Sequence, residues 1–200
     1  MHPIPCGSSD QTSAHLQLQQ FWREEPEPGF QSGIVTVHWK PQAWVIQAVL
    51  QDRECFNPVQ GFNQPAYLDG DVFELFLQPP GREDYFEFHV GPDNQLYQLH
   101  LPSVEHFATH RHSGLPTDWF IETPHLESTV TQRQDSWTVE AKVPVEMLGI
   151  GRITTDQRWK LSFCRYDRNR NPETCVLSST SPLNEVDFHR INEWNDVLTV

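Results

Sequence analysis

Short segments in which apolar and polar residues alternate are the feature that most constrains the fold of this chain. Residues 71–78, 85–90 and 137–143 each alternate with a period of two, the period of a β-strand, whose successive side chains point to opposite faces. Turn sequences interrupt the first two runs, PPG after residue 78 and GPDN after residue 90. Helical periodicity is almost absent, so the pattern predicts an all-β chain.

Further runs of the same kind predict how these strands are connected. Residues 34–39 and 43–50 are joined by Lys40-Pro41-Gln42, a tight-turn sequence that predicts a hairpin. Additional strands are expected at 95–101, 126–133, 159–166 and 175–179, with a closing strand within 187–200. Many short strands separated by turns favour an antiparallel β-sandwich of the jelly-roll type. One short helix is expected near 145–149, between Pro144 and Gly149.

The length of 200 residues corresponds to one ordinary domain. We expect residues 1–33, which are rich in Pro, Gly and Gln, to form an irregular N-terminal lead-in with at most a short edge strand. The sandwich is then expected to span residues 34–200.

The net charge argues against some partners. The chain has 14 Lys and Arg against 27 Asp and Glu, a formal net charge of −13. Such a chain repels phosphate backbones, so no nucleic-acid partner is expected. No apolar run approaches the roughly 20 residues of a membrane-spanning helix. Residues 1–20 lack the basic and apolar regions of a secretory signal, so the chain as written is expected to be cytoplasmic, and secreted or periplasmic if a leader was removed.

The four cysteines, Cys6, Cys55, Cys164 and Cys175, lack the spacing of a zinc site. Cys164 and Cys175 flank a polar loop, so a disulfide across a hairpin is one alternative. Free thiols packed as small apolar side chains are the favoured one.

Two clusters of ionisable residues each allow a chemical and a structural interpretation. Glu74 and Glu87 lie on the polar faces of strands expected to pair, where two carboxylates would suit glycoside hydrolysis. A solvated sheet face is the favoured interpretation. His100, Glu105, His106, His110 and His112 crowd one segment and could ligate a metal, but a polar loop without metal is favoured.

Aromatic residues provide the remaining functional signal. The chain has seven tryptophans, and aromatic rings stack on the C–H faces of sugars. Trp137 and Trp159 lie on inward faces and are expected in the core. Tyr67 precedes the acidic turn Asp69-Gly70-Asp71 and is the better candidate for an exposed stacking platform.

Five segments occur in an order that resembles a known family. They are VIQAVLQD, DGDVFELFLQPPGREDYFEFHVGPDNQLY, SWTVEAKVPVEMLG, WKLSFCRYDR and FHRINEWNDVLTV. Together they resemble the family 9 carbohydrate-binding modules and the wider dopamine β-monooxygenase N-terminal-like group, over residues 34–200. The resemblance implies a β-sandwich that binds sugars or the chain ends of glucans and xylans, acts in carbohydrate catabolism, and often accompanies glycoside hydrolases.

The resemblance also implies roles for single residues. Glu74 matches the carboxylate that accepts sugar hydroxyls, Arg165 matches the arginine that ends the WKLSFCR strand, and Tyr67 stands near one of two stacking tryptophans. The segment CVLSSTSP has no second tryptophan. No cofactor is firmly predicted, although the family's structural calcium is compatible with several aspartates at strand ends.

We therefore predict a non-catalytic carbohydrate-binding domain, standing alone rather than attached to a hydrolase. The predicted sugar-binding residues are Tyr67, Glu74, His89, Gln98, Arg165 and Asn169. The alternatives are a haem-binding relative of the same sandwich, a hydrolase that uses Glu74 and Glu87, and a domain whose sugar site has decayed. Haem would need His89 or His100 as an axial ligand, because Met1 and Met147 are the only methionines.

Overall fold

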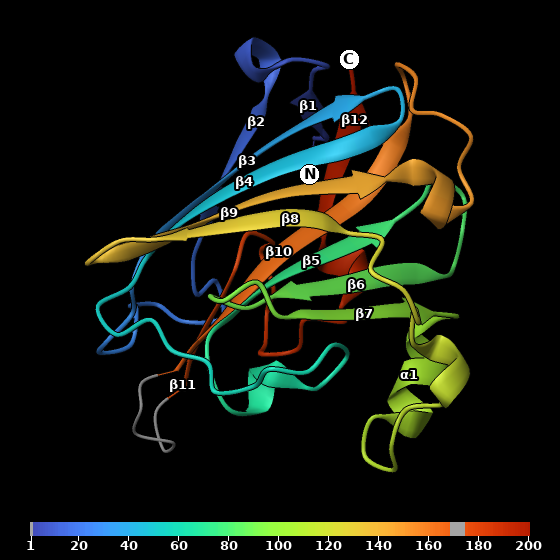
Figure 1. Cartoon of the computed structure of the whole chain (residues 1–200). Helices are drawn as coiled ribbons and strands as arrows, with labels where there is room; N and C mark the ends of the chain where they lie inside the picture. The colour runs from blue at the N-terminus through green and yellow to red at the C-terminus, as the bar shows by residue number, and fades with distance from the viewer. Residues whose placement is uncertain (1, 169–174) are drawn as a thin grey trace.

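Two β-sheets pack face to face and form a sandwich (Figure 1). The computed structural model describes residues 2–168 and 175–200. Nearly all strand pairs are antiparallel, and the pairing of the first and last strands is parallel. The predicted all-β sandwich is confirmed.

The larger sheet has seven strands in the order β1-β12-β10-β5-β6-β7, with β11 beside the second half of β10. The long strand β10 is its centre, because it pairs with β5 along one edge and with β12 and β11 along the other. The strands are β1 (Ile4–Cys6), β5 (Val72–Gln78), β6 (Tyr85–Val90), β7 (Leu96–Leu101), β10 (Arg158–Arg168), β11 (Cys175–Ser179) and β12 (Asn195–Thr199).

The smaller sheet has five strands in the order β2-β3-β4-β9-β8. It contains the predicted hairpin of β3 and β4 and the hairpin of β8 and β9. The strands are β2 (Ala14–Leu18), β3 (Gly33–Lys40), β4 (Ala43–Gln51), β8 (Glu127–Gln132) and β9 (Ser136–Pro144).

Helices are few and short. The one α-helix among the described residues is α1 (Val104–His110). It begins at Ser103, whose side chain accepts a hydrogen bond from the His106 N–H. The predicted short helix is the 3₁₀ helix η4 (Val145–Leu148), which ends at Gly149 in the left-handed conformation, φ 70°. The other 3₁₀ helices are η1 (Asp10–Thr12), η2 (Ala66–Leu68), η3 (Thr117–Trp119) and η5 (Ile191–Glu193).

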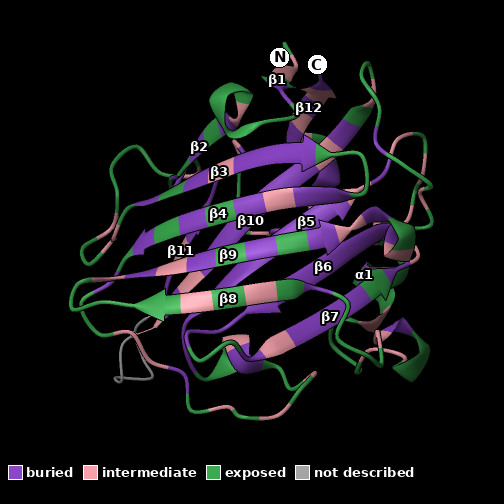
Figure 2. Ribbon diagram, turned by 45° about the horizontal axis from the view of Figure 1, so that its top comes forward, coloured by how far each residue is buried: buried purple, intermediate pink, exposed green. Residues whose placement is uncertain are grey.

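The main core lies between the two sheets and follows the predicted alternation. Phe73, Leu75 and Leu77 of β5 point inward, and Trp137 and Trp159 are fully buried as expected. Alternate residues of β4 and β9 point to solvent, and Figure 2 shows this as bands of purple, pink and green along these strands.

A second apolar layer covers the outer face of the larger sheet. All six residues of β6 are buried, on both faces of the strand (Figure 2). Side chains of α1, η3 and the segment 183–194 pack on this face, among them Phe107, Trp119, Leu183, Phe188 and Trp194. The expectation that Glu74 and Glu87 lie on a solvated face is therefore wrong, because these segments exclude water from it.

The first 33 residues contribute regular structure. β1 pairs with β12 of the larger sheet, and β2 pairs with β3 of the smaller one. Strands of three and five residues carry too few alternating positions to stand out from an irregular segment. The stretch between β2 and β3 is irregular.

All four cysteines are free thiols. The strand register explains why Cys164 and Cys175 do not pair. Cys164 lies opposite Ser179, whereas Cys175 lies opposite Arg168. The disulfide alternative is therefore wrong.

None of the helices in residues 2–168 and 175–200 has the length and apolar character needed to cross a membrane.

We predict that Phe163→Ala lowers the free energy of unfolding by about 3–5 kcal/mol. Phe163 is fully buried on β10 and stacks on Phe73 with the ring centroids 6.1 Å apart, so its removal leaves a cavity in the core. Urea denaturation measures the change. Val49→Ala is the control, because Val49 is 38% exposed on β4 and should lose less than about 1 kcal/mol. Equal losses in the two variants would contradict the prediction.

Candidate functional site

A row of side chains across four strands forms the floor of a cavity on the outer face of the larger sheet. The register places Cys164, Glu74, His89 and Tyr97 side by side on β10, β5, β6 and β7. Glu87 precedes His89 by two residues on β6 and shares its face. The cavity measures about 230 Å³ and is partly open to solvent.

His89 joins the two glutamates at the bottom of this cavity. Its Nε2 lies 3.1 Å from Oε1 of Glu74 and 2.6 Å from Oε1 of Glu87. The side chains are almost fully buried, with 1%, 3% and 7% exposure for His89, Glu74 and Glu87. Two carboxylates can be buried together here because the imidazole offers both a donor and a positive charge.

The protein environment separates the pKa values of the two glutamates. Burial and the charge of Glu87 raise the pKa of Glu74 to about 8, although His89 opposes the shift. Burial also acts to raise the pKa of Glu87, but the His89 hydrogen bond and the nearby histidine charges outweigh it and hold that pKa below its usual value. The carboxylates raise the pKa of His89 against the effect of burial. The environment thus favours the charged forms of Glu87 and His89 and the protonated form of Glu74.

A second histidine reaches the same cavity from the C-terminal part of the chain. Nε2 of His189 lies 3.9 Å from Oε2 of Glu87, and its Nδ1 lies 2.8 Å from the Tyr85 hydroxyl. Phe107 stacks on the imidazole ring with the centroids 3.6 Å apart. Burial lowers the pKa of His189 to about 4, so this imidazole is neutral at pH 7.

Aromatic rings form the wall above the glutamates. Tyr67, from η2, lies with its ring centroid 5.5 Å from that of His89, 6.2 Å from that of Tyr97 and 5.6 Å from that of Tyr166. Phe188 packs edge-on against Tyr166. Tyr67 is half-buried, so part of its ring faces the opening.

One ion pair borders the opening. Nη1 of Arg111 lies 3.0 Å from Oδ2 of Asp187, and the Arg111 guanidinium also lies over the Phe107 ring. The cavity therefore combines aromatic faces, carboxylates, imidazoles and a guanidinium, the groups that contact the rings and hydroxyls of small polar ligands.

Three of the six predicted site residues, Tyr67, Glu74 and His89, line this cavity. Gln98 pairs with Phe88 and so lies on the inner face, where its side chain binds the backbone of Thr123, His125 and Leu126.

Arg165 also points inward, opposite Phe73. Asn169 lies outside the described residues. The structure thus does not bring Gln98 or Arg165 to the cavity.

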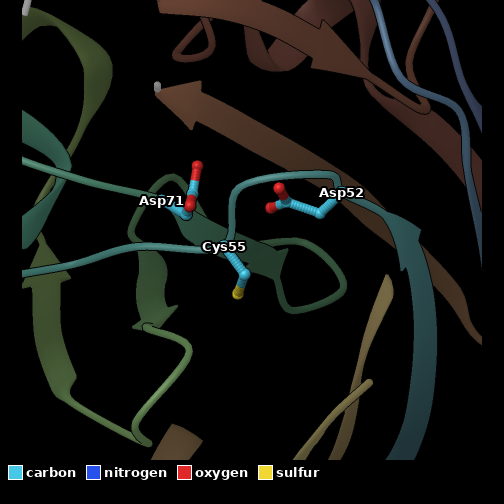
Figure 3. Close-up of side chains that lie close together, drawn as sticks. All are labelled: Asp52, Cys55 and Asp71. Carbon is cyan, nitrogen blue, oxygen red and sulfur yellow. The ribbon is translucent and has the colours of Figure 1, made fainter. Parts of the chain in front are cut away.

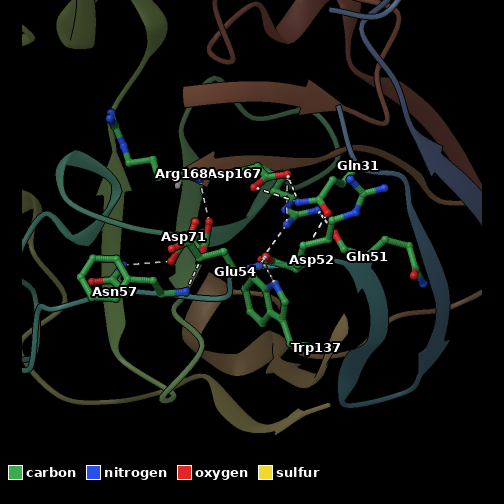
Figure 4. Close-up of polar contacts among 12 residues, drawn as sticks. Gln31, Gln51, Asp52, Glu54, Asn57, Asp71, Trp137, Asp167 and Arg168 are labelled. Atoms are coloured by element: carbon green, nitrogen blue, oxygen red, sulfur yellow. Dashed lines mark hydrogen bonds and ion pairs between the residues drawn. The ribbon is translucent and has the colours of Figure 1, made fainter. Parts of the chain in front are cut away.

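Arg165 instead belongs to a buried polar network. Figure 4 labels other members of this network, among them Asp52, Trp137 and Asp167. The Arg165 guanidinium donates to Asp52 Oδ2 at 2.8 Å and to the Gln51 carbonyl at 2.6 Å, and it lies 3.3 Å from Asp167. The Trp137 indole N–H also donates to Asp52. The guanidinium is fully buried, so its role here is to neutralise two aspartates.

The residues next to this network do not fit the structural calcium that the family resemblance implies. Asp52, Cys55 and Asp71 lie close together (Figure 3). The four carboxylate oxygens of Asp52 and Asp71 already accept hydrogen bonds from N–H groups. The two oxygens of Asp71 accept from the backbone of Phe56 and Arg168. Those of Asp52 accept from the Glu54 backbone and the Trp137 indole. Burial raises the pKa of the Cys55 thiol, and a thiol is no ligand for calcium.

The other candidates from the sequence lie apart from the cavity floor. His106 and His110 lie one turn apart on α1, and only His112 of the histidine-rich segment lines the cavity. His100 pairs with Asp84 at 2.6 Å outside it, and Met147 packs against the main core. His89, His100 and Met147, the residues considered as axial ligands of haem, therefore do not face a common cavity. Met1 lies outside the described residues.

Solved structures with the same fold include three sugar-related ones. One is a protein of Bacteroides uniformis ATCC 8492 proposed to bind carbohydrate, with a TM-score of 0.71, 13% identity and coverage of 95% of this chain and 88% of that one. Two are family 9 carbohydrate-binding modules from Caldicellulosiruptor kristjanssonii. The cellotriose complex gives a TM-score of 0.68 at 10% identity, covering 99% of this chain and 93% of that one. The glucose complex gives 0.66 at 9% identity, covering 100% and 96%.

The chain has the fold of family 9 carbohydrate-binding modules. No protein-family model matches the sequence, and no curated protein matches it. The fold predicted from the five ordered segments is thus confirmed, with identities so low that the likeness concerns the fold alone.

Sequence reasoning missed several cavity residues. Tyr97 and Tyr166 carried a usable signal, because the alternation places them on the same faces as His89 and Cys164. Arg111, Asp187 and His189 carried none, since they lie in loops that only tertiary packing brings to the sheet.

We predict that Arg165→Met lowers the free energy of unfolding by about 3–5 kcal/mol, because Asp52 and Asp167 lose their buried cation. Arg158→Met on the same strand is the control. Its guanidinium pairs with Asp196 but is 62% exposed, so the loss should stay below about 1 kcal/mol. Chemical denaturation measures both values. An Arg165→Met chain as stable as Arg158→Met would contradict the structural role.

We further predict that Asp71 makes stability depend on pH. Burial and the charge of Asp52 raise its pKa to about 7, against the backbone N–H donors and Arg165. Between about pH 4 and pH 7 the folded state therefore holds a proton that the unfolded state has lost, so stability falls as pH rises. The contribution of Asp71 to this fall is about 1–3 kcal/mol between pH 5 and pH 8.

Asp71→Asn should remove this contribution to the change of unfolding free energy with pH, whatever its effect on absolute stability. Asp69→Asn, in the adjoining exposed turn, should keep the wild-type dependence of unfolding free energy on pH. Urea titrations at several pH values compare the three chains. Parallel curves for the wild type and Asp71→Asn would refute the assignment.

Proposed function

We propose that this chain is a non-catalytic carbohydrate-binding domain whose cavity holds one sugar ring, either a monosaccharide or the end residue of a glucan or xylan. The observation that carries the proposal is the meeting of an aromatic wall and a buried carboxylate–histidine floor in one cavity. Its volume, about 230 Å³, lies below the roughly 300–1,000 Å³ of pockets for larger ligands. A single ring therefore fits better than an extended chain.

Each part of the cavity has a role in this proposal. Tyr67 stacks on the C–H face of the sugar, and Tyr97 and Tyr166 hold the Tyr67 ring in place. Glu74, His89 and Glu87 exchange hydrogen bonds with sugar hydroxyls, since carboxylates accept and the imidazolium donates. Arg165 and Gln98 take no part in contacting the sugar, because they lie on the other face of the sheet.

The fold adds support. Two domains of the same fold are complexes with glucose and with cellotriose, and glucose is a single-ring sugar of the size that this cavity suits. The affinity should be modest, because a single sugar ring buries few atoms.

A hydrolase is the second candidate, favoured by one observation. The ligating atoms of Glu74, Glu87 and His89 all lie within 4.8 Å of one another, and the protein separates the pKa values of the two carboxyl groups. Paired carboxyl groups about 5–5.5 Å apart act in retaining glycosidases. Turnover of nitrophenyl glycosides that is lost in Glu74→Gln would favour this candidate over simple binding.

We predict that Tyr67→Ala and Glu74→Gln each weaken sugar binding by at least about tenfold, because one removes the stacking face and the other a buried acceptor. Isothermal titration calorimetry against a panel of mono- and oligosaccharides measures the affinity, once with a chelator and once with added zinc. Phe21→Ala and Glu140→Gln are matched controls, because both side chains are exposed away from the cavity. The controls should bind as the wild type does.

No heat with any sugar, in either buffer, would overturn the proposal. Equal losses in the controls would move the binding site away from this cavity.

A further inference from the structure

We propose that Glu74, Glu87, His89 and His189 form a binding site for a divalent transition metal ion of the zinc class. This site goes beyond sugar binding and does not depend on it.

Three of the four side chains converge as the ligands of one ion do, because one ligand atom each of Glu74, Glu87 and His89 lies within 4.8 Å of the other two. Nε2 of His89 lies 3.1 Å from Glu74 Oε1 and 2.6 Å from Glu87 Oε1, and Nε2 of His189 lies 3.9 Å from Glu87 Oε2. Four ligands about 2.1 Å from a tetrahedral zinc ion are separated by about 3.4 Å. The separations of 3.1 Å and 2.6 Å between the His89 nitrogen and the two carboxylate oxygens lie near this value. His189 contacts the other Glu87 oxygen at 3.9 Å, so its ring would move toward the other three ligands when an ion binds.

The surrounding structure orients His189 for this role. Its Nδ1 lies 2.8 Å from the Tyr85 hydroxyl, and Phe107 stacks on its ring. With the proton on Nδ1 donated to the Tyr85 oxygen, Nε2 presents its lone pair toward Glu87. A hydrogen bond at the remote ring nitrogen is the usual way in which a protein fixes a metal-binding imidazole.

Two buried polar atoms of the cluster lack a hydrogen-bond partner among the described residues. They are Oε2 of Glu87 and Nδ1 of His89, on side chains that are only 7% and 1% exposed. The Glu87 oxygen faces His189 within the cavity. Buried polar atoms are nearly always partnered, so an unpartnered carboxylate oxygen between two imidazoles points to a missing cation.

The ligand set selects the class of ion. Two imidazoles and two carboxylates match zinc and related transition metals, whereas calcium and magnesium prefer oxygen ligands alone. The two carboxylates supply the charge that neutralises a divalent ion. Because the cluster lines the cavity, a water or a ligand oxygen can complete the coordination from the open side.

Metal titration of the full chain tests the proposal. After treatment with a chelator and its removal, the wild type should bind one Zn²⁺ by calorimetry. Co²⁺ in place of zinc should give the visible bands of a tetrahedral nitrogen and oxygen site. Glu87→Gln and His189→Gln should each weaken zinc binding by about tenfold or more.

Two controls test histidines that lie outside the proposed site. His106→Asn/His110→Asn removes two histidines spaced one turn apart on α1, and His100→Gln removes a histidine paired with Asp84 outside the cavity. Both controls should bind zinc as the wild type does. Loss of binding in the α1 variant would overturn the proposal, as would the absence of binding in the wild type.

The Co²⁺ spectrum decides the question even where a variant fails to fold. A thiolate charge-transfer band would show that a cysteine binds the metal, either Cys55 with Asp52 and Asp71 or Cys164 beside Glu74, and would overturn the proposal. Failure of the metal proposal can also be told apart from failure of the sugar proposal, because sugar binding is measured both with a chelator and with added zinc.

Discussion

One buried imidazole that contacts two carboxylates, by a hydrogen bond to Glu87 and an ion pair with Glu74, is the constraint on which the functional face of this protein depends. Carboxylates removed from water need a partner, and the register of β5 and β6 supplies one by setting His89 directly opposite Glu74 and two residues from Glu87. A shift of this register by one residue would turn the carboxylates into the main core. The precise pairing of two apolar-rich strands thus decides whether the cavity can exist, and the aromatic wall of Tyr67, Tyr97 and Tyr166 is built upon it.

The two faces of the larger sheet carry two polar centres with different tasks. On the inner face, Arg165 neutralises Asp52 and Asp167 where no solvent reaches, so this centre stabilises the sandwich. On the outer face, the centre around His89 retains unpartnered atoms and opens to a cavity. Among the described residues, both centres keep buried atoms without a hydrogen-bond partner, Nε of Arg165 on the inner face and Oε2 of Glu87 and Nδ1 of His89 on the outer face. The outer centre differs in that it lines a cavity that a ligand can enter. This contrast is the physical reason for placing the proposed sugar and metal ligands on the outer face alone.

The cover over the outer face explains how an acidic chain can hold these groups out of water. α1, η3 and the segment 183–194 add a third layer to what would otherwise be a two-layer sandwich (Figures 1 and 2). That layer buries the glutamates, raises the pKa of Glu74 and lowers that of His189. It also brings Arg111 and Asp187 to the rim. Domains with 9–13% identity share the sandwich, while these contacts belong to the side chains of this chain.

Local alternation in the sequence was enough to determine the main strands after residue 33, their faces and the sandwich, because side-chain direction in a strand follows from backbone geometry. It did not reveal β1 and β2, which are too short to show a period. The alternation also placed Glu74 and Glu87 on one face and Arg165 on the other, beside Trp159 and Phe163. The family resemblance nevertheless assigned Arg165 to the sugar, although the alternation pointed its side chain inward. Only the tertiary structure decided that the outer face is covered, that His189 meets Glu87 about a hundred residues away in the chain, and that Gln98 binds loop backbone. Burial of a strand face depends on which distant loops pack against it, and no local period encodes that choice.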